Sequence, residues 1–350
     1  MTSRSRTALP TIAGLAAAAT LVLALRFPTL AAAGWLIAFV FLSAIPLGSV
    51  AWLMVARLTG GHWGLSLQPT FQAATAAIPL LLVAFVPVLL ALRLLYPWVD
   101  PWVAGAPALK VDVALFYLNA PLFILRTGVA LLGWSVLALL VPRRGGRPGI
   151  LLAAAGLIFH ALMVSLLSVD WILSIEPTFI SSSFGATTAI TQMLAALAFA
   201  ALFARGLDDR ALRDLAGLML AATLAVTYLN FMAVLVIWYG DLPAKVSWLA
   251  ERVNEPWRAL AVATFVLGSA MPVLLLLLER VRANRMALRY VAASTLAGIA
   301  LYDAFLLAPP YGAWALGTAA LCATALSCAF LAIAHLGWPS VLFERVETVP

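Results

Sequence analysis

Residues 32–56 read AAGWLIAFVFLSAIPLGSVAWLMVA and contain no charged side chain. A helix of about 20 mainly apolar residues is long enough to cross the hydrocarbon core of a bilayer. Similar apolar runs occur at 8–25, 73–96, 114–141, 149–169, 185–205, 213–239, 257–279, 286–308 and 313–336. The sequence therefore predicts about ten transmembrane helices in a single transmembrane domain that covers residues 1–350.

The overall composition leads to the same fold class. Of the 350 residues, 65% are hydrophobic and 10% are charged, whereas a soluble domain is roughly half apolar and about a quarter charged. A folded soluble chain keeps a large surface that water must wet, so it could not hide this many apolar side chains. Inside a bilayer each backbone polar group must be paired within the protein, which favours helices. We expect an all-α, polytopic membrane protein without a soluble catalytic domain.

The basic residues predict the orientation of these helices. Cytoplasmic loops of membrane proteins carry an excess of Lys and Arg. Of the 21 Lys and Arg residues, fourteen lie on one predicted side and six on the other, with Arg126 inside a span, which predicts that both termini are cytoplasmic. The larger group is Arg4, Arg6, Arg57, Arg143, Arg144, Arg147, Arg205, Arg210, Arg213, Arg280, Arg282, Arg285, Arg289 and Arg345, and the smaller is Arg26, Arg93, Lys110, Lys245, Arg252 and Arg258.

The loops themselves are short. The outer ones are expected at 97–113, 170–184, 240–256 and 309–312, and none is long enough to form a soluble domain. Because the basic residues lie in short loops between apolar runs, the net charge of +7 does not indicate nucleic-acid binding. Arg4 and Arg6 precede an apolar stretch as in a signal peptide, but another span follows directly and no convincing cleavage site is present. We interpret this stretch as a retained first helix.

No cofactor site of the chain's own is predicted. Cys322 and Cys328 are six residues apart on one predicted helix, so they point about 240° apart and are expected to be buried hydrophobic residues. The three histidines, His62, His160 and His335, share no predicted depth, which argues against a haem held by two of them. No His, Cys and carboxylate residues have the spacing of a metal site.

Two local features carry conformational predictions. Several predicted spans contain proline, which is tolerated in a membrane helix as a kink; these residues are Pro46, Pro79, Pro87, Pro121 and Pro272. The segment LTGGHWG, residues 58–64, has two adjacent glycines in a tight inner loop that includes His62. It is expected to be a turn in which glycine supplies positive φ rather than a phosphate-binding loop.

Polar residues at membrane depth are costly, so each is a candidate functional residue. His160 lies near the middle of the fifth span, Asp170 and Glu176 follow at its outer end, and Asp303 lies beside Tyr302 near the outer end of the ninth. The other members of the set are Asn119 and Arg126 in the fourth span, Thr187, Thr188, Thr191 and Gln192 in the sixth, and Tyr228 and Asn230 in the seventh. We predict a proton path or a quinone site among His160, Asp170, Glu176, Asp303, Arg126, Asn119, Gln192, Tyr228 and Asn230.

Each of these residues also has a purely structural interpretation. Arg126 could pair with Asp170 or Asp303 and hold helices together, without a further role. The three amides could be interhelical hydrogen-bonding groups, contributing about 1 kcal/mol each. His160 is either a core residue with satisfied hydrogen bonds or part of a proton relay or quinol site, because an unperturbed histidine side chain titrates near neutral pH.

Five segments together resemble one protein family. They are LTGGHWG at 58–64, LYPW at 95–98, LNAPLFILR at 118–126, VDWILSIEPTFISSSFG at 169–185 and TYLNFMAVLVIWYGDLPAKVSWLAER at 227–252. In this order they resemble the second quinone-binding-type membrane subunit of bacterial alternative complex III, a quinol:electron-acceptor oxidoreductase. That protein belongs to the wider polysulfide-reductase, NrfD-like family of membrane subunits. The resemblance extends from about residue 45 to 260, and its DW…S.EP and IW.G.LP elements are the most specific.

The resemblance implies a fold, partners and a location. The fold would have ten spans in two four-helix bundles, flanked by peripheral first and last helices, in the bacterial inner membrane. The chain would have no cofactor of its own and no activity alone, while haem c and iron–sulfur clusters would lie in periplasmic partner subunits beside an NrfD-like first membrane subunit. Binding of quinone or menaquinone by this subunit is left open.

The two most specific elements are expected to face the docking partners. Asp170, Trp171, Ser174, Glu176 and Pro177 match the DW…S.EP element, and Trp238, Gly240, Leu242 and Pro243 match the IW.G.LP element.

The chain departs from the family at several positions. Ala56 and Arg57 precede the glycine turn where the family has histidine, which puts a proton-entry role for that turn in question. Tyr239 replaces a small residue, and Ala244 and Lys245 make the outer loop less acidic than usual, which puts partner docking in question. The chain is also shorter than expected of this subunit.

Three functional hypotheses remain at this stage. In the first, the chain is a membrane subunit of a quinol-oxidising complex, and Asp170, Glu176, Asp303 and His160 pass protons while Arg126 tunes a nearby carboxylate. In the second, it is a stand-alone transporter, although paired, interrupted helices in matching halves are not evident. In the third, it is a structural scaffold. Loss of turnover with normal assembly after replacement of Asp170 or His160 separates the first from the third.

Overall fold

The structure, a computed structural model, describes residues 3–100, 111–177, 179–241 and 243–335. Among these residues the regular elements are all helical. Nine described segments are long and apolar enough to cross a membrane: Pro28–Thr59, His62–Leu90, Ala120–Leu140, Gly146–Ile175, Phe184–Phe203, Asp209–Gly240, Trp257–Leu277, Arg285–Leu307 and Trp314–Ile333. The first helix contributes a shorter apolar stretch, Gly14–Arg26. The prediction of an all-α, polytopic membrane protein is confirmed.

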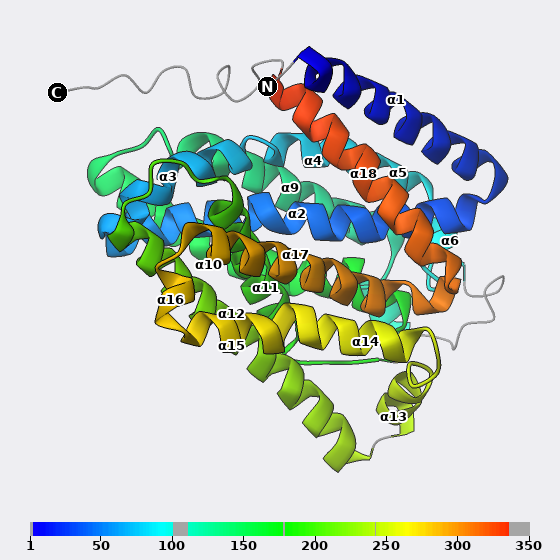
Figure 1. Ribbon diagram of the computed structural model, residues 1–350. Coiled ribbons are helices and arrows are strands. Elements are labelled where there is room, and N and C mark those ends of the chain that lie inside the picture. The colour runs from blue at the N-terminus through cyan, green and yellow to red at the C-terminus, as the bar shows by residue number, and fades with distance from the viewer. Residues whose placement is uncertain (1–2, 101–110, 178, 242, 336–350) are drawn as a thin grey trace.

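The helices form two groups of four. The first group contains α2 (Pro28–Thr59), the broken helix α3 to α6 (His62–Thr75, Ile78–Ala84, Val86–Leu90 and Leu92–Leu95), α9 (Ala120–Leu140) and α10 (Gly146–Trp171). The second contains α11 (Phe184–Phe203), α12 (Asp209–Gly240), α14 with α15 (Trp257–Phe265 and Met271–Leu277) and α17 (Arg285–Leu307). The groups meet where α2 packs against α11 and α17, and where α10 packs against α11 (Figure 1).

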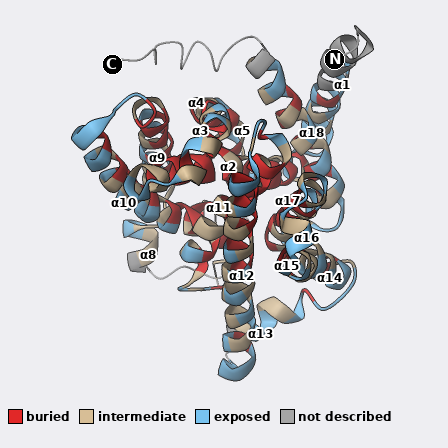
Figure 2. Ribbon diagram, turned by 60° about the vertical axis from the view of Figure 1, so that its left-hand side comes forward, coloured by how far each residue is buried: buried red, intermediate tan, exposed pale blue. Residues whose placement is uncertain are grey.

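The remaining long helices lie outside these groups. α1 (Ser3–Arg26) packs against α18 (Trp314–His335), and both contact α2 (Figure 1). This is the arrangement of peripheral first and last helices that the resemblance implied. Buried residues gather on α2 and α11 and on the inner faces of their neighbours (Figure 2). Short elements complete the described chain: α8 (Val111–Phe116), α13 (Pro243–Ala250), α16 (Glu279–Arg282), η1 (Leu173–Ile175) and η3 (Pro309–Tyr311).

The prolines do not all act as kinks. Pro46 lies inside α2, as predicted, but Pro121 is in the first turn of α9, where a missing N–H costs no hydrogen bond. Pro79 and Pro87 lie in the first turns of α4 and α5, so the third span is broken into short helices. This span was predicted to begin at residue 73, but its helix begins at His62.

A π-helical turn, Val266–Ala270, separates α14 from α15, and Pro272 follows it. A π turn widens the helix and leaves backbone groups to be satisfied from outside. Ser294 of α17 supplies one such contact, because its hydroxyl donates to the Leu267 carbonyl at 2.8 Å. At this point Gly268 and Gly298 face each other so closely that a Cβ on Gly298 would overlap the backbone of Gly268. The two helices therefore cross through a pair of glycines, as closely packed membrane helices often do.

One end of the molecule gathers the turns that were predicted to be cytoplasmic. Arg57 donates to two carbonyls of the α9–α10 turn, at 2.7 and 3.0 Å. Arg285 donates to the carbonyl of Leu207 in the α11–α12 turn at 2.7 Å, and His62 Nε2 lies 3.2 Å from the carboxylate of Asp208 in the same turn. His62 was predicted to lie in a loop, but it opens α3; the loop proper is Gly60–Gly61, with φ of 67° and 101° as expected.

The opposite end gathers the predicted outer segments. The Tyr96 hydroxyl donates to the carbonyl of Trp171 at 3.2 Å, and the Tyr311 hydroxyl donates to the last carbonyl of α6 at 2.6 Å. Arg252, between α13 and α14, donates to the carbonyl of Leu306 at 3.4 Å. The described loops thus alternate between two ends in the order the span count requires. Which end faces the cytoplasm stays a prediction, and Lys110 and Arg345 lie outside the described residues.

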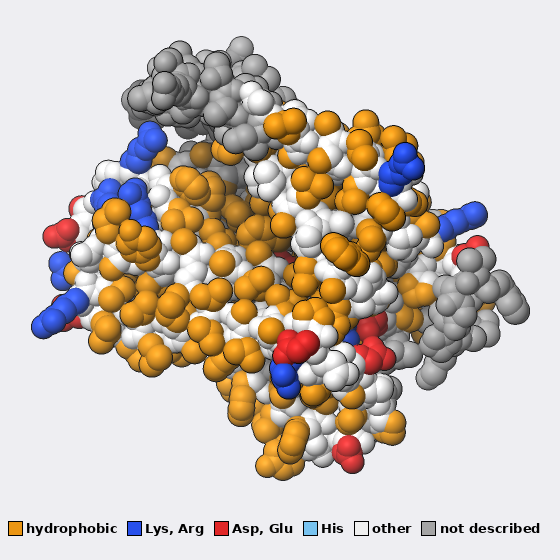
Figure 3. All heavy atoms as spheres, turned by 45° about the vertical axis from the view of Figure 1, so that its right-hand side comes forward, with side chains coloured by type: hydrophobic (Ala, Val, Ile, Leu, Met, Phe, Trp, Pro, Cys, Tyr) orange, Lys and Arg blue, Asp and Glu red, His pale blue; other side chains and the backbone are white. Residues whose placement is uncertain are grey.

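The surface between the two ends is apolar. Hydrophobic side chains cover the middle of the face shown in Figure 3, and charged side chains lie mainly toward its ends and lower edge. Large apolar side chains are exposed on many helices, for example Leu90, Ile158 and Leu274. A soluble monomer rarely exposes apolar surface on this scale, whereas contact with lipid requires it.

Candidate functional site: a polar cavity beside an apolar cleft

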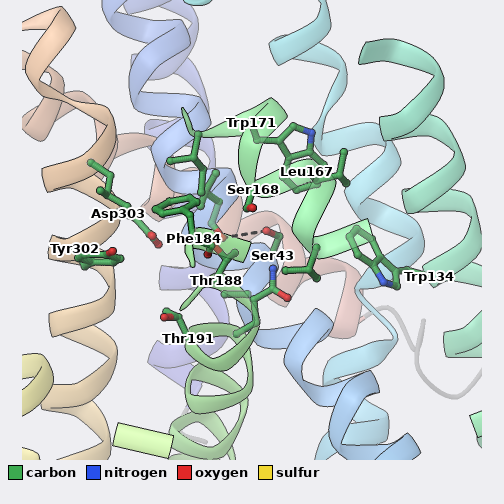
Figure 4. A pocket seen from close by; sticks show the side chains of 16 residues that line it. Ser43, Trp134, Leu167, Ser168, Trp171, Phe184, Thr188, Thr191, Tyr302 and Asp303 are labelled. Carbon is green, nitrogen blue, oxygen red and sulfur yellow. Dashed lines mark hydrogen bonds between the residues drawn. The ribbon is translucent and has the colours of Figure 1, made fainter. Parts of the chain in front are cut away.

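A small polar cavity lies where the two helix groups meet. It has a volume of about 30 Å³, and its walls come from α2, α9, α10, α11 and α17 (Figure 4). Its polar lining residues are Ser43, Trp134, Ser168, Trp171, Thr188, Thr191, Gln192, Tyr302 and Asp303. Of the predicted site residues, Gln192 and Asp303 line this cavity, although they lie more than a hundred residues apart in sequence.

Several polar groups of this cavity lack a hydrogen-bond partner. Trp134 Nε1, Thr191 Oγ1 and Gln192 Oε1 are buried and have none within the described structure. Asp303 is 6% exposed, and neither a hydrogen bond nor an ion pair joins its carboxyl group to a described residue. Buried polar groups are normally paired, and exceptions often mark an unseen water or ion, or a functional group. The cavity is therefore a candidate site for a water molecule, an ion or another small guest that bonds to these groups.

Close helix packing fixes the position of Gln192. A Cβ on Gly48 of α2 would overlap the backbone carbonyl of Gln192 on α11, so glycine is required for the two helices to approach this closely. Nearby, the Trp52 indole donates to the carbonyl of Met193 at 2.9 Å. These two contacts hold α11 against α2 at the floor of the cavity.

A larger, mainly apolar cleft lies next to the cavity in the second helix group. It has a volume of about 700 Å³ and lies among α11, α12, α13, α14 and α17. The predicted residues Tyr228 and Asn230 line it, and the Tyr302 hydroxyl donates to Asn230 Oδ1 at 2.9 Å. Phe184, Tyr302 and Leu306 line both the cleft and the cavity. A lipid-soluble molecule in the cleft would therefore lie one side chain away from the polar cavity.

Asp170 has a different environment from Asp303. Its carboxylate, with no exposed side-chain surface, accepts two hydrogen bonds from Arg126, at 2.6 and 3.0 Å. Arg126 also donates to the carbonyl of Tyr117 at 3.0 Å, and its guanidinium lies 4.2 Å from the centre of that ring. Burial, with the Asp170 carboxylate nearby, raises the pKa of the Tyr117 phenol, which keeps it neutral. Of the two partners predicted for Arg126, the structure selects Asp170, and the pair joins α9 to α10.

A second ion pair ties the outer loop to the helices. Glu176 accepts hydrogen bonds from the guanidinium of Arg252 and, at 3.1 Å, from the indole of Trp248. The Arg252 guanidinium stacks 3.8 Å from the Trp248 ring and is almost fully buried. Trp248 also stacks on Phe179, with ring centroids 4.1 Å apart. Glu176 therefore anchors α13 beside the cleft.

Two other predicted site residues lie apart from both cavities. His160 is buried on α10, its ring 5.9 Å from that of Trp134, and neither ring nitrogen has a partner in the described part of the chain. Asn119 caps the N-terminus of α9, because its side chain accepts from the N–H of Leu122 at 3.0 Å and donates to Leu115 and Ala114. Asn119 therefore links the end of α8 to the start of α9, two helices that follow each other in the chain, rather than helices from distant parts of the sequence.

The predicted docking residues divide into buried and exposed groups. Trp171 is buried and donates to the Thr127 hydroxyl at 3.1 Å, and Ser174 is buried and donates to the carbonyl of Asp170 at 2.6 Å. Pro177 is half-buried. Trp238 is 76% exposed, and Gly240 and Pro243 are also exposed. The IW.G.LP element thus offers more exposed surface to a partner than the DW…S.EP element does, and its Leu242 lies outside the described residues.

Sequence reasoning missed three residues of these sites. Arg252 was treated only as one of the outer basic residues, although it is the buried partner of Glu176. Trp134 and Ser43 were not singled out, because each stands alone within a long apolar run, yet both line the cavity. The one sequence signal for Arg252 is its position four residues after Trp248, a spacing that puts two side chains on the same face of a helix.

Compared with known proteins, the chain matches no family model, and no curated protein sequence matches it significantly.

Proposed function

We propose that the chain is an integral membrane subunit of a quinol-oxidising respiratory complex of the alternative complex III kind, in a bacterial inner membrane. In this proposal the apolar cleft receives the quinone or menaquinone ring, and the polar cavity receives a proton from it. Partner subunits, including an NrfD-like first membrane subunit, carry haem c and iron–sulfur clusters.

The observation that carries the proposal is the shared wall between the cleft and the cavity. Oxidation of a quinol releases two electrons and two protons, and the protons need a polar acceptor at membrane depth. The cleft is apolar enough for a ring with a prenyl tail and has Asn230 and Tyr302 as polar groups. On the other side of Tyr302 lies the carboxyl group of Asp303. A lipid-soluble donor and a buried proton acceptor would thus be neighbours.

The ion pairs of Asp170 and Glu176 support a structural role for these two carboxylates within that function. Each is held by an arginine, so neither is free to carry a proton without breaking its pair. The proton role therefore falls on Asp303. His160, which lies against Trp134 at the edge of the same region, is the next group that a proton could reach.

Docking of redox partners is assigned to the exposed end of α12. Trp238 and Tyr239 present large aromatic surfaces there, and exposed aromatic residues are typical anchors of protein interfaces.

Co-purification tests the respiratory assignment. The tagged protein is purified from its native membrane in a gentle detergent and examined by mass spectrometry and by a reduced-minus-oxidised visible spectrum. Co-purification of c-type haem and iron–sulfur subunits is expected. A protein that emerges alone and colourless contradicts the assignment and returns attention to the transporter hypothesis.

Turnover of the intact complex tests the role of Asp303. Asp303→Asn removes the titratable group but keeps its shape, so it is expected to lower quinol oxidation by roughly a hundredfold while the complex still assembles. Asp209→Asn, an exposed position at the start of α12, is the matched control and should keep wild-type turnover. Wild-type turnover in Asp303→Asn would remove Asp303 from the proton path.

A further inference from the structure

The polar cavity is lined by buried polar groups that lack partners and by the carboxyl group of Asp303, which lacks a counter-ion among the described residues. We propose that it is a binding site for a monovalent cation, Na⁺, which occupies the site at Asp303 in exchange for a proton. This inference rests on the cavity alone and does not require the respiratory function proposed above.

The first step is that the cavity presents hydrogen-bond acceptors. Three lining hydroxyls already donate their protons to carbonyls of their own helices: Ser43 to Val40 at 3.0 Å, Ser168 to Ser165 at 2.9 Å and Thr188 to Phe184 at 3.0 Å. A hydroxyl that has donated its proton has only lone pairs left to offer. These three side chains therefore offer acceptor oxygens to the cavity, whereas the indole N–H of Trp134 lines it as a donor without a partner. Figure 4 shows Ser43, Ser168, Thr188 and Asp303 arranged around the cavity.

The unpartnered groups add to this set. Gln192 Oε1 is a buried acceptor without a donor, and Thr191 Oγ1 is buried without a partner in the described structure. Both residues are more than nine-tenths buried and line the cavity. Amide, hydroxyl and carboxylate oxygens are the ligands that hard cations prefer. A guest that satisfies these acceptor oxygens must be a cation or a rich hydrogen-bond donor, and a water molecule bound beside a cation would accept from the indole N–H of Trp134.

The second step is charge. A buried carboxylate is costly unless it is protonated or paired with a positive charge. The neighbouring basic groups are already committed: Arg126 pairs with Asp170, and Arg252 pairs with Glu176. The Tyr302 hydroxyl donates to Asn230, and His160 packs on Trp134 without lining the cavity. Asp303 therefore has no counter-ion among the described residues that surround it.

One carboxylate calls for one positive charge. A monovalent cation makes the site neutral, whereas a divalent cation would leave a net positive charge at membrane depth. A proton on Asp303 also makes the site neutral, so H⁺ and Na⁺ can replace each other one for one with no change in net charge.

The third step is size. A cavity needs about 10–15 Å³ to hold one water molecule, and this cavity has about 30 Å³. It can hold a Na⁺ ion with one water molecule. The larger K⁺ ion needs more oxygen ligands at longer distances, so it is expected to bind more weakly.

The test measures Na⁺ binding to the purified full-length protein, alone or in its complex. Isothermal titration with NaCl is carried out at alkaline pH in a sodium-free buffer, with N-methylglucamine chloride added to keep the ionic strength constant. Saturable binding of one Na⁺ per chain is expected. When the titration is repeated at pH values below the range where Asp303 ionises, release of one proton per bound Na⁺ is expected, measured from the dependence of the binding heat on the buffer, and the affinity should fall about tenfold for each further pH unit.

Three variants make the test specific. Asp303→Asn is expected to abolish Na⁺ binding, and Gln192→Leu to weaken it at least about tenfold through loss of a ligand. Asp209→Asn, at the far end of α12, should bind as the wild type does. If Asp303→Asn does not fold, the buffer and pH dependence of the wild-type protein, which require no variant, still decide the matter.

Two outcomes overturn the proposal: no saturable Na⁺ binding by folded wild-type protein, or Na⁺ binding that is unchanged in Asp303→Asn. The first outcome would mean that the cavity binds only protons and water. Co-purification of haem and iron–sulfur subunits is measured separately, so failure of the cation site and failure of the respiratory function give different results.

Discussion

At the scale of single residues, two buried aspartates show how surroundings decide a role. Asp170 and Asp303 both lie near the C-terminal ends of their helices, α10 and α17, and both are buried. Asp170 accepts two hydrogen bonds from the guanidinium of Arg126, which stabilises the charge of the carboxylate and engages both of its oxygens. Asp303 instead lines a cavity with several polar side chains and no basic one. The sequence shows two similar aspartates, and only the folded chain shows that one is paired with an arginine while the other lines a cavity without a counter-ion among the described residues.

The Arg126–Asp170 pair leads to a stability prediction. Arg126→Leu leaves the Asp170 carboxylate buried without its partner, which is expected to destabilise the protein by about 3–5 kcal/mol. The measurement is thermal unfolding in detergent. The double variant Arg126→Leu with Asp170→Leu removes both charges and should recover much of the loss. Arg93→Leu, an exposed position, serves as the control. Wild-type stability in Arg126→Leu would mean that Asp170 needs no counter-ion.

At the scale of helices, the sequence predicted that the spans exist better than it predicted where each helix starts, kinks or breaks. A charge-free run such as 32–56 can only be a span, because the bilayer alone accepts it. The third span is different, since Pro79 and Pro87 start the new short helices α4 and α5, and Ala76 and Ala77 form a turn between α3 and α4. Whether a proline kinks, starts or breaks a helix depends on which neighbours satisfy the freed carbonyls. Those neighbours are contacts in the fold, which one sequence does not specify.

The glycine crossing of α17 with the π turn gives a prediction at this scale. Gly298→Ala would place a Cβ against the backbone of Gly268, and backbone cannot rotate away as a side chain can. We expect α14 and α15 to separate from α17, with a loss of about 1–3 kcal/mol in stability and a lower unfolding temperature. Gly217→Ala in α12 is the control, because a Cβ there meets nothing within 4 Å. It should be neutral or slightly stabilising, since alanine favours helix. Equal stability of the two variants would contradict the close crossing.

At the scale of the whole molecule, the sequence predicted the polar residues but not how they are grouped. The cavity needs five helices to meet, and Gln192 and Asp303 become neighbours only when α11 packs against α17. The depth of a residue in the membrane can be inferred from its position in an apolar run, because that depth depends on local composition. Helix neighbours depend on packing over the whole chain, so the pairing of Asp170 with Arg126 rather than of Asp303 with Arg126 could be stated only as one of two alternatives.

The orientation of the molecule in the membrane can be tested with cysteines. The two native cysteines are buried and free, so a background with Cys322→Ala and Cys328→Ala has no reactive thiol. Arg144→Cys lies in the α9–α10 turn at the basic end, and Ala313→Cys lies in the turn before α18 at the opposite end. A membrane-impermeant maleimide should label Ala313→Cys in intact spheroplasts but Arg144→Cys only after lysis, because the side richer in Lys and Arg is expected to face the cytoplasm. Ala313→Cys is already exposed on the outside, so it also reports that the protein is inserted and that the reagent reaches it. The reverse labelling pattern would place the exposed end of α12 and its Trp238 in the cytoplasm, and docking of periplasmic redox subunits there would then be impossible.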